Sequence, residues 1–321
     1  MKKTKLFLTY FREETNMVGK GDFFGYPSFT IENGRISLTV TEYGATALSL
    51  RFDGREMILG FDTLAEYEQS GSCAGGIVGR FANRIGAAAF TLGGERYALC
   101  ANERGNTLHG GTDGTIWHKR RWQGEICGEN AVAFTLHSPD GDNGFPGEIS
   151  ARALYTVTEK SVRIDFSGCP TKDTVFAPTS HIYFSLGEEN ILGVQMQINA
   201  SGHLAVDNAL IPTGEILPAA GDFDFSTPRP IGRNFDDAFV LCASPACTAQ
   251  TDSVRLSLFT DYPALQLYTG EFLDGKLAPN AGFAIEPEQY PDAPNRPEFP
   301  SAAVRAGEKF SKYLEFVFEQ I

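Results

Sequence analysis

Glu286 lies in a stretch that would fix a carboxylate. In GFAIEPEQYPDAPNRP, residues 282–297, alternating apolar residues indicate a strand with Phe283 and Ile285 on one side and Glu286 on the other. Pro287 restricts Glu286 to extended backbone, and we expect the strand to end there. Taken alone, the pattern is more typical of a solvated surface glutamate. The alternative is a catalytic acid or base at the mouth of a cleft, with the proline-rich segment as its wall.

Four other stretches hold residue types that act in catalysis or binding. They are GGIVGRFANRIG with Asn83 and Arg84, GNTLHGG with His109, APTSHIYFSLG with His181, and RNFDDAFVL with Asp236 and Asp237. Each has an ordinary structural explanation, because glycines form tight turns, a single histidine is often a hydrogen-bonded structural residue, and paired Asp residues cap turns. Each stretch alone is weak evidence for a functional site, and the five stretches together, in this order, are stronger evidence.

Other kinds of site have less support. The glycine-rich GxxGR segment lacks the GK[ST] ending and the following helix of a phosphate loop, which argues against nucleotide binding. No HxH or HExxH spacing occurs, so we expect neither a metal nor another cofactor. The remaining histidines, His118, His137 and His203, lie in polar or turn-like surroundings and are interpreted as surface residues.

Charge and cysteine content restrict the partners and the compartment. A formal net charge of −13 disfavours nucleic acid and anionic membranes, because both would repel the chain, whereas a neutral small molecule would not be repelled. The N-terminus has too short an apolar run for a signal peptide, and no segment has the length of a membrane span. Six cysteines without a CxxC pair indicate reduced thiols and a cytoplasmic protein.

The elements that position these residues are predicted to be strands. Runs such as AVAFTLHS, SVRIDFSG, VRLSLFTD and KYLEFVFEQ carry apolar residues at period two, and turn clusters separate them. Only DTLAEYEQS is typical of a helix. The pattern predicts an all-β fold, one large antiparallel β-sandwich over residues 24–321. Residues 1–23 are interpreted as an N-terminal extension.

From about Gly34 to the C-terminus the chain resembles the aldose 1-epimerase, or galactose mutarotase, family. The resemblance is carried by an ordered set of motifs: YGATALSL, LGFDTLAEY, GRFANRI, NTLHGG, PTSHIYFSL, IPTGEI, FDDAF, LQLYTGEFL and GFAIEPEQYPDAPNRPEFP. Their order and spacing are far more specific than any one of them. The resemblance implies a large β-sandwich of the galactose mutarotase type, which agrees with the strand pattern.

The resemblance also implies roles. Glu286 resembles the general base that takes the proton of the C1 hydroxyl, and His181 the general acid that protonates the ring oxygen. Five residues resemble sugar ligands: Asn83, Arg84, His109, Asp236 and Gln266. Three aromatic residues, Phe81, Tyr183 and Tyr268, are either core residues or stacking surfaces for a pyranose.

The chain departs from the family pattern beside these residues. Ser180 and Ser185 stand where asparagines are common, and Asp237 and Ala238 stand where a histidine and an asparagine are frequent. These differences leave open which sugar is preferred and whether Asp236 or Asp237 faces the pocket.

Three functions are compatible with this pattern. The first is a mutarotase for free hexoses such as galactose or glucose, with a small-molecule sugar as its partner. The second is an epimerase for another sugar or a sugar phosphate, for which Arg80, Arg84 and Arg296 offer few cations. The third is a non-catalytic carbohydrate-binding protein, which we would expect to lack the acid or the base.

Overall fold

Strands form nearly all of the regular structure. The structure, a computed structural model, describes residues 17–112 and 115–321. β12 (Ala131–Ser138) and β14 (Ser161–Gly168) coincide with two of the predicted runs. α1 (Leu64–Gln69) forms within DTLAEYEQS and starts with a capping box of Thr63 and Glu66. None of the described helices is long and apolar enough to cross a membrane.

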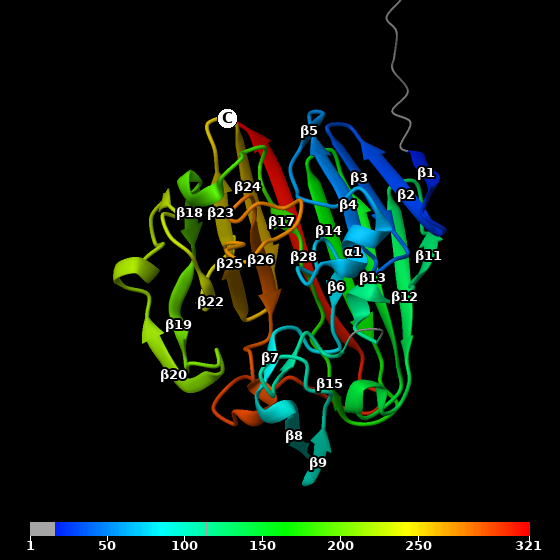
Figure 1. The fold of residues 1–321 in the computed structure, drawn as a ribbon, viewed down its shortest axis with the longest axis vertical. Coiled ribbons are helices and arrows are strands. Elements are labelled where there is room, and N and C mark those ends of the chain that lie inside the picture. Colours follow the sequence, from blue (N-terminus) through cyan, green and yellow to red (C-terminus); the bar gives the residue numbers. More distant parts are fainter. Residues whose placement is uncertain (1–16, 113–114) are drawn as a thin grey trace, which may run out of the picture.

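One layer of the sandwich is a nine-stranded antiparallel sheet. Its strands, in spatial order, are β11 (Gln123–Ile126), β12, β13 (Ile149–Val157), β14, β28 (Phe310–Gln320), β24 (Val254–Thr260), β23 (Cys247–Gln250), β18 (Gln195–Ile198) and β21 (Arg229–Pro230). The C-terminal strand β28 lies in the middle, between β14 and β24 (Figure 1). The end of the chain therefore joins the two halves of this sheet.

The other layer contains two antiparallel sheets. The five-stranded sheet has the order β1 (Met17–Phe23), β2 (Tyr26–Asn33), β3 (Ile36–Thr41), β4 (Ala47–Phe52) and β5 (Arg55–Glu56). The six-stranded sheet has the order β17 (Tyr183–Phe184), β26 (Phe283–Glu288), β25 (Ala264–Tyr268), β22 (Asp236–Leu241), β19 (Ala200–Val206) and β20 (Pro212–Pro218).

Both sheets of this second layer pack on β28. The ring of Phe52 from β4 lies 5.7 Å from that of Phe318, and the ring of Phe184 from β17 lies 4.9 Å from that of Phe316. These rings belong to one continuous cluster of buried side chains. The predicted antiparallel β-sandwich is therefore confirmed, with the core between the nine-stranded sheet and the paired smaller sheets.

Short pairs and turns connect the large sheets. The two-stranded pairs are β6 (Ile77–Val78) with β16 (Thr179–Ser180), β7 (Arg84–Ile85) with β10 (Thr107–Leu108), β8 (Ala89–Leu92) with β9 (Glu95–Ala98), and β15 (Thr174–Val175) with β27 (Ala303–Val304). The 3-10 turns are η1 (Gly86–Ala88), η2 (Trp117–Lys119), η3 (Asp142–Gly144), η4 (Ile191–Gly193), η5 (Gly221–Phe223) and η6 (Ala293–Asn295).

Two predicted boundaries differ from the structure. Residues 17–23 of the predicted extension form β1, which pairs with β2, and the rest of the extension lies outside the described residues. β26 does not end at Glu286 but continues through Pro287 to Glu288. The strand tolerates Pro287 because β17 pairs with β26 only as far as Ala284, so no ladder requires the missing N–H group.

Candidate active site

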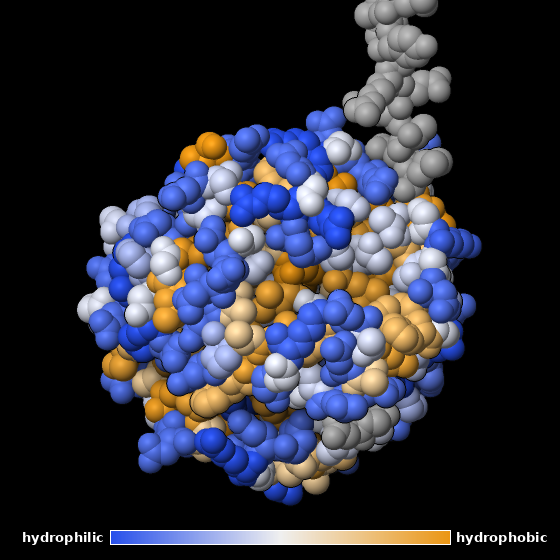
Figure 2. All heavy atoms as spheres, turned by 45° about the horizontal axis from the view of Figure 1, so that its top comes forward, coloured by the Kyte–Doolittle hydropathy of each residue, from blue (hydrophilic) through white to orange (hydrophobic). Residues whose placement is uncertain are grey.

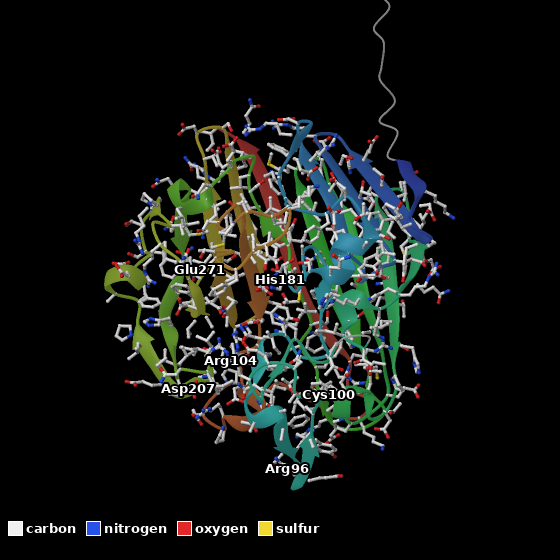
Figure 3. All side chains as sticks on the ribbon, viewed as in Figure 1. Arg96, Cys100, Arg104, His181, Asp207 and Glu271 are labelled. Atoms are coloured by element: carbon white, nitrogen blue, oxygen red, sulfur yellow. The ribbon has the colours of Figure 1, made fainter. Side chains whose placement is uncertain are left out.

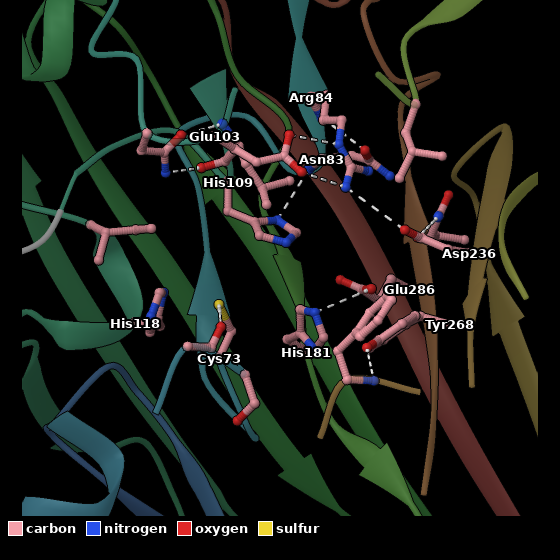
Figure 4. A pocket seen from close by; sticks show the side chains of 18 of the residues that line it. Cys73, Asn83, Arg84, Glu103, His109, His118, His181, Asp236, Tyr268 and Glu286 are labelled. Carbon is pink, nitrogen blue, oxygen red and sulfur yellow. Dashed lines mark hydrogen bonds and ion pairs between the residues drawn. The ribbon is translucent and has the colours of Figure 1, made fainter. Parts of the chain in front are cut away.

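The six-stranded sheet presents polar side chains on the face turned away from the core. On β26, Phe283 and Ile285 enter the core, and Glu286 projects from the opposite face. Gln266 on β25 is the cross-strand partner of Glu286. Its amide Nε2 donates a 2.6 Å hydrogen bond to Oδ1 of Asp236 on β22. Three neighbouring strands thus place an amide and two carboxyl groups side by side (Figure 4).

His181 reaches Glu286 from a separate segment. It follows β16, and its backbone is held by hydrogen bonds with Gly75 and Gly76. The imidazole Nε2 lies 3.5 Å from Oε1 of Glu286, and the two side chains are only 6% and 3% exposed. Figure 3 shows His181 near the middle of the molecule, beside the six-stranded sheet. The predicted acid and base, 105 positions apart, therefore meet in space.

Asn83 and His109 are held together by their backbones. The Asn83 N–H group donates to Nδ1 of His109 at 3.2 Å, and the His109 N–H group donates to the Asn83 carbonyl at 3.1 Å. Both residues adopt positive φ angles, 63° and 54°. Because Nδ1 accepts a hydrogen bond, the proton of the neutral imidazole resides on Nε2.

Arg84 is fixed by a carboxylate that was not predicted from the sequence. Its Nε and Nη2 atoms donate to the two carboxylate oxygens of Glu103, each at 3.0 Å, and Nη2 lies 3.7 Å from Oδ2 of Asp236. Arg84 is 8% exposed, and a buried guanidinium requires such partners. The need of a buried arginine for an acidic partner was the only feature of the sequence that could have indicated Glu103.

These residues surround one cavity of about 660 Å³. The residues predicted as acid, base and sugar ligands all line it: Asn83, Arg84, His109, His181, Asp236, Gln266 and Glu286. Asp236 lines the cavity and Asp237 does not, which answers the question that the sequence left open. Figure 2 shows a face on which hydrophilic residues surround a central apolar region.

The aromatic residues divide between the cavity and the core. Tyr183 and Tyr268 line the cavity, with their rings 6.1 Å apart. Phe81 is fully buried in a separate core cluster, so its role is packing.

Two histidines were wrongly interpreted as surface residues. His118 and His203 are each 7% exposed, while His137 is exposed. His118 lines the far end of the cavity, and the ring of His203 stacks on that of Phe223 at 3.7 Å. Their polar sequence surroundings misled the prediction, because tertiary packing buries both side chains.

The proline-rich segment after Glu286 does not form the cavity wall that we expected. Asp292 in this segment accepts a 2.9 Å hydrogen bond from the Gly86 N–H group and donates its own N–H to the Arg84 carbonyl at 2.8 Å. The segment therefore holds the backbone of β7 and of the turn that follows it, and does not line the cavity. The wall opposite the sheet comes instead from residues within 102–112, 116–119 and 71–73.

Burial controls the protonation of the central pair. It raises the pKa of Glu286 well above its usual range, with a contribution from Asp236, while Arg84 opposes the rise. Burial also lowers the pKa of His181 to about 4, below the value of about 6.5 that is usual for a histidine. Burial thus disfavours the charged form of both groups, so a proton shared by the pair is favoured on Glu286 over His181 in the empty site.

The donors of the cavity suit hydroxyl groups better than a metal ion. Within residues 17–112 and 115–321, no group of three or more His, Cys, Asp or Glu is arranged to hold a metal. Burial, followed by the neighbouring His181, lowers the pKa of His109 well below its usual value, so this imidazole is neutral. Carboxylates, a guanidinium, an amide and a neutral imidazole around one cavity offer donors and acceptors to a polyhydroxylated ligand.

Comparison with known proteins agrees with this geometry. The family model described as aldose 1-epimerase matches residues 27–317. The chain belongs to the aldose 1-epimerase family. It is 34% identical to a galactose mutarotase of Sus scrofa, over 90% of this chain and 93% of the relative, and 35% identical to an aldose 1-epimerase of Haemophilus influenzae, over 90% and 94%.

Solved structures of the family have the same fold. An aldose epimerase homologue from C. elegans superposes with a TM-score of 0.87 at 26% identity, over 94% of this chain and all of the other. A galactose 1-epimerase from Lactobacillus acidophilus gives a TM-score of 0.86 at 28% identity, over 94% and 98%. The galactose mutarotase type of sandwich is thereby confirmed.

Proposed function

We propose that this protein is an aldose 1-epimerase that interconverts the α and β anomers of a free hexose such as galactose or glucose. The observation that carries the proposal is the 3.5 Å approach of His181 Nε2 to Glu286 Oε1 at the wall of a cavity lined with sugar-binding types of residue. Family membership supports the same reaction.

The reaction requires two proton transfers and no redox step. As base, Glu286 takes the proton of the C1 hydroxyl, and as acid, His181 delivers a proton to the ring oxygen O5. The C1–O5 bond breaks, C1 becomes an aldehyde, and rotation about C1–C2 exposes its other face. O5 then attacks C1 again, returning its proton to His181, while the new C1 oxygen takes the proton held by Glu286. Each positioned group contributes roughly 10²- to 10⁴-fold.

Binding of the sugar favours the protonation state that this direction needs. The C1 hydroxyl donates to the Glu286 carboxylate, and O5 accepts from a protonated His181, so both charged forms gain a hydrogen bond. At 3.5 Å the opposite charges also attract each other. These interactions oppose the cost of burial, which in the empty site keeps the proton on Glu286.

We assign the surrounding residues to substrate orientation. The Nε2–H group of His109 is available as a donor, since its Nδ1 is occupied by the Asn83 backbone. Asp236 and Gln266 present a carboxylate and an amide that hold hydroxyls on the sheet side. Arg84, which Glu103 holds in place, stabilises negative charge on the opening sugar.

The charges around the cavity favour a neutral sugar over a sugar phosphate. Among the described residues, the charged ones that line it are three cationic ones, Arg84, Arg104 and Lys119, and three acidic ones, Glu103, Asp236 and Glu286. Glu103 engages the guanidinium of Arg84. A phosphate with a charge near −2 is bound by an excess of cations, which this balance does not supply.

We also infer a cytoplasmic location and a single domain. Each of the six cysteines is a free thiol, which suits a reducing compartment. The nine-stranded sheet joins segments between residues 123 and 320 into one sandwich, which supports one domain.

Polarimetry of freshly dissolved α-glucose and α-galactose tests the proposed function. We expect catalytic amounts of protein to accelerate the approach to the equilibrium rotation above the spontaneous rate. Hexose 6-phosphates, followed by anomer-exchange NMR, serve as the comparison. Binding of sugars without acceleration would instead indicate a non-catalytic sugar-binding protein.

A further inference from the structure

A second buried carboxyl group lies beside the proposed base. Glu288 follows Glu286 by two positions on β26, so both side chains project from the same face of the strand. Glu288 is 1% exposed and does not line the cavity. Its cross-strand partner on β25 is Ala264, which offers no polar group. The proposed mechanism gives this carboxyl group no role.

Glu288 has one hydrogen-bond partner, and that partner leads to the cavity. Its Oε1 accepts a 3.0 Å hydrogen bond from Nδ2 of Asn83, while no described residue bonds to its Oε2. Oδ1 of Asn83 accepts from the Arg84 N–H group at 2.8 Å, and the Asn83 N–H group bonds to His109. Asn83 thus connects Glu288 with two residues of the proposed sugar site.

Two of the three charged groups that act on Glu288 oppose its ionised form. Glu286 on the same strand and Asp236 on β22 are acidic, and Arg84 is engaged by Glu103. Within the described chain Glu288 forms no ion pair. Tyr262 also faces it, but its hydroxyl donates to the Pro178 carbonyl. Burial, followed by the charge of Glu286, raises the pKa of Glu288 well above its usual range, while the hydrogen bond from Asn83 and the charge of Arg84 oppose the rise.

We propose that Glu288 is a positioning residue that keeps its proton at neutral pH and, as a neutral acceptor, holds Asn83 so that His109 presents its Nε2–H group to the sugar. Asn83 has a left-handed backbone, and the hydrogen bond to Glu288 ties its side chain to the sheet. A proton on Glu288 also leaves Glu286 as the one carboxyl group of the pair that ionises when the sugar binds. The part of this inference that concerns sugar turnover rests on the proposed function.

Two substitutions separate a neutral acceptor from a charge. In Glu288→Gln the side-chain oxygen still accepts from Asn83, so we expect this variant to retain most of the kcat/KM of the natural protein, with an unchanged pH profile. In Glu288→Ala the acceptor is lost, and we expect kcat/KM to fall about 10- to 100-fold, chiefly through KM. Ile285→Ala, on the core face of the same strand, is the matched control for lost stability.

Two further measurements do not depend on turnover. Infrared difference spectra between the natural protein and Glu288→Gln are expected to show the C=O band of a protonated carboxylic acid at neutral pH. With five histidines in the chain, ¹⁵N NMR can follow the ring nitrogens of His109, assigned with His109→Gln. We expect Glu288→Ala to shift these signals, whereas Glu288→Gln and Ile285→Ala leave them in place.

Several results would overturn the inference. One is a Glu288→Gln variant as impaired as Glu288→Ala, which would mean that the charge is needed. Another is an unchanged His109 spectrum in Glu288→Ala, and a third is the absence of the protonated carboxyl band. If Glu288→Ala does not fold, two measurements still test the inference: the infrared band of the protonated carboxyl group and the pH profile of kcat/KM for Glu288→Gln. If no aldose is turned over, the proposed function fails while the spectra still test the role of Glu288.

Discussion

Replacing Glu286 with glutamine tests the proposed mechanism most directly. Glutamine keeps the shape of the side chain and an acceptor oxygen but cannot take the C1 hydroxyl proton. It also removes the charge 3.5 Å from His181, whose attraction for an imidazolium is about 5 kcal/mol at an effective dielectric constant of about 20. The acid is thereby weakened together with the base. We therefore expect kcat to fall toward the upper end of the range for a single general base, about 10⁴-fold.

The assay is polarimetric decay from fresh α-galactose, with the spontaneous rate subtracted. Sugar affinity is measured separately by calorimetry, and we expect it to stay within about threefold of the natural value. Thermal stability should be unchanged or higher. Glu286 is 2% exposed, and glutamine removes the desolvation penalty of a buried ionisable group while it keeps the shape of the side chain. Glu315→Gln on β28, in the opposite layer, is the matched control.

A second variant shows whether the two residues act as a unit. His181→Ala alone should also lose most of the turnover. The double variant Glu286→Gln, His181→Ala should then be little slower than either single variant, because losing one member of an acid–base pair already removes the contribution of the other. Turnover of Glu286→Gln within about tenfold of the natural rate would refute the assignment of the base, and fully additive losses would refute the pair.

Three further predictions concern neighbouring features. Glu103→Ala frees Arg84, and we expect KM to rise about tenfold with a smaller change in kcat, whereas an unchanged KM would show that Arg84 needs no anchor. The profile of kcat/KM against pH should be bell-shaped, because a second proton on the His181–Glu286 pair removes the base and loss of the shared proton removes the acid. Since the pKa of His181 is about 4, the acidic limb should lie well below pH 6.5, and a limb at pH 6.5 would contradict the burial argument. Gly110→Ala should lower the melting temperature by several degrees, because a Cβ there would lie 2.4 Å from the backbone of Gly79, and an unchanged melting curve would contradict this.

Local pattern predicted the strands because each run of period-two apolar residues has one buried face. β12 and β14 were found to the residue, since both faces of these runs differ clearly in polarity and turns bound them. The helix α1 was found because the pattern of DTLAEYEQS is local, and the structure adds a capping box at its start. The ordered motifs then identified the residues of the cavity, which no single strand could do.

Properties that depend on distant partners were not predictable. In the sequence Glu103 resembles any polar loop residue. Only the pairing of β7 with β10 brings it beside Arg84. His118 is buried where η2 packs against β6, and the low pKa of His181 arises from its burial next to β16, which pairs with β6. Each of these follows from a tertiary contact and leaves no local pattern.

The continuation of β26 past Pro287 explains how an imidazole can reach the base. Pro287 has no N–H group, and its carbonyl accepts a 2.7 Å hydrogen bond from the side chain of Thr179 instead of a strand backbone. Beyond Ala284, this side of β26 therefore has no ladder with β17. In that interval the chain from Thr179 to Ile182 runs past β26 without pairing with it, and Thr179 and Ser180 pair with β6 instead. His181 lies in this interval, so the position where proline forbids a regular ladder is the position from which Nε2 reaches Glu286. A residue with an N–H group at 287 would present a donor toward this interval.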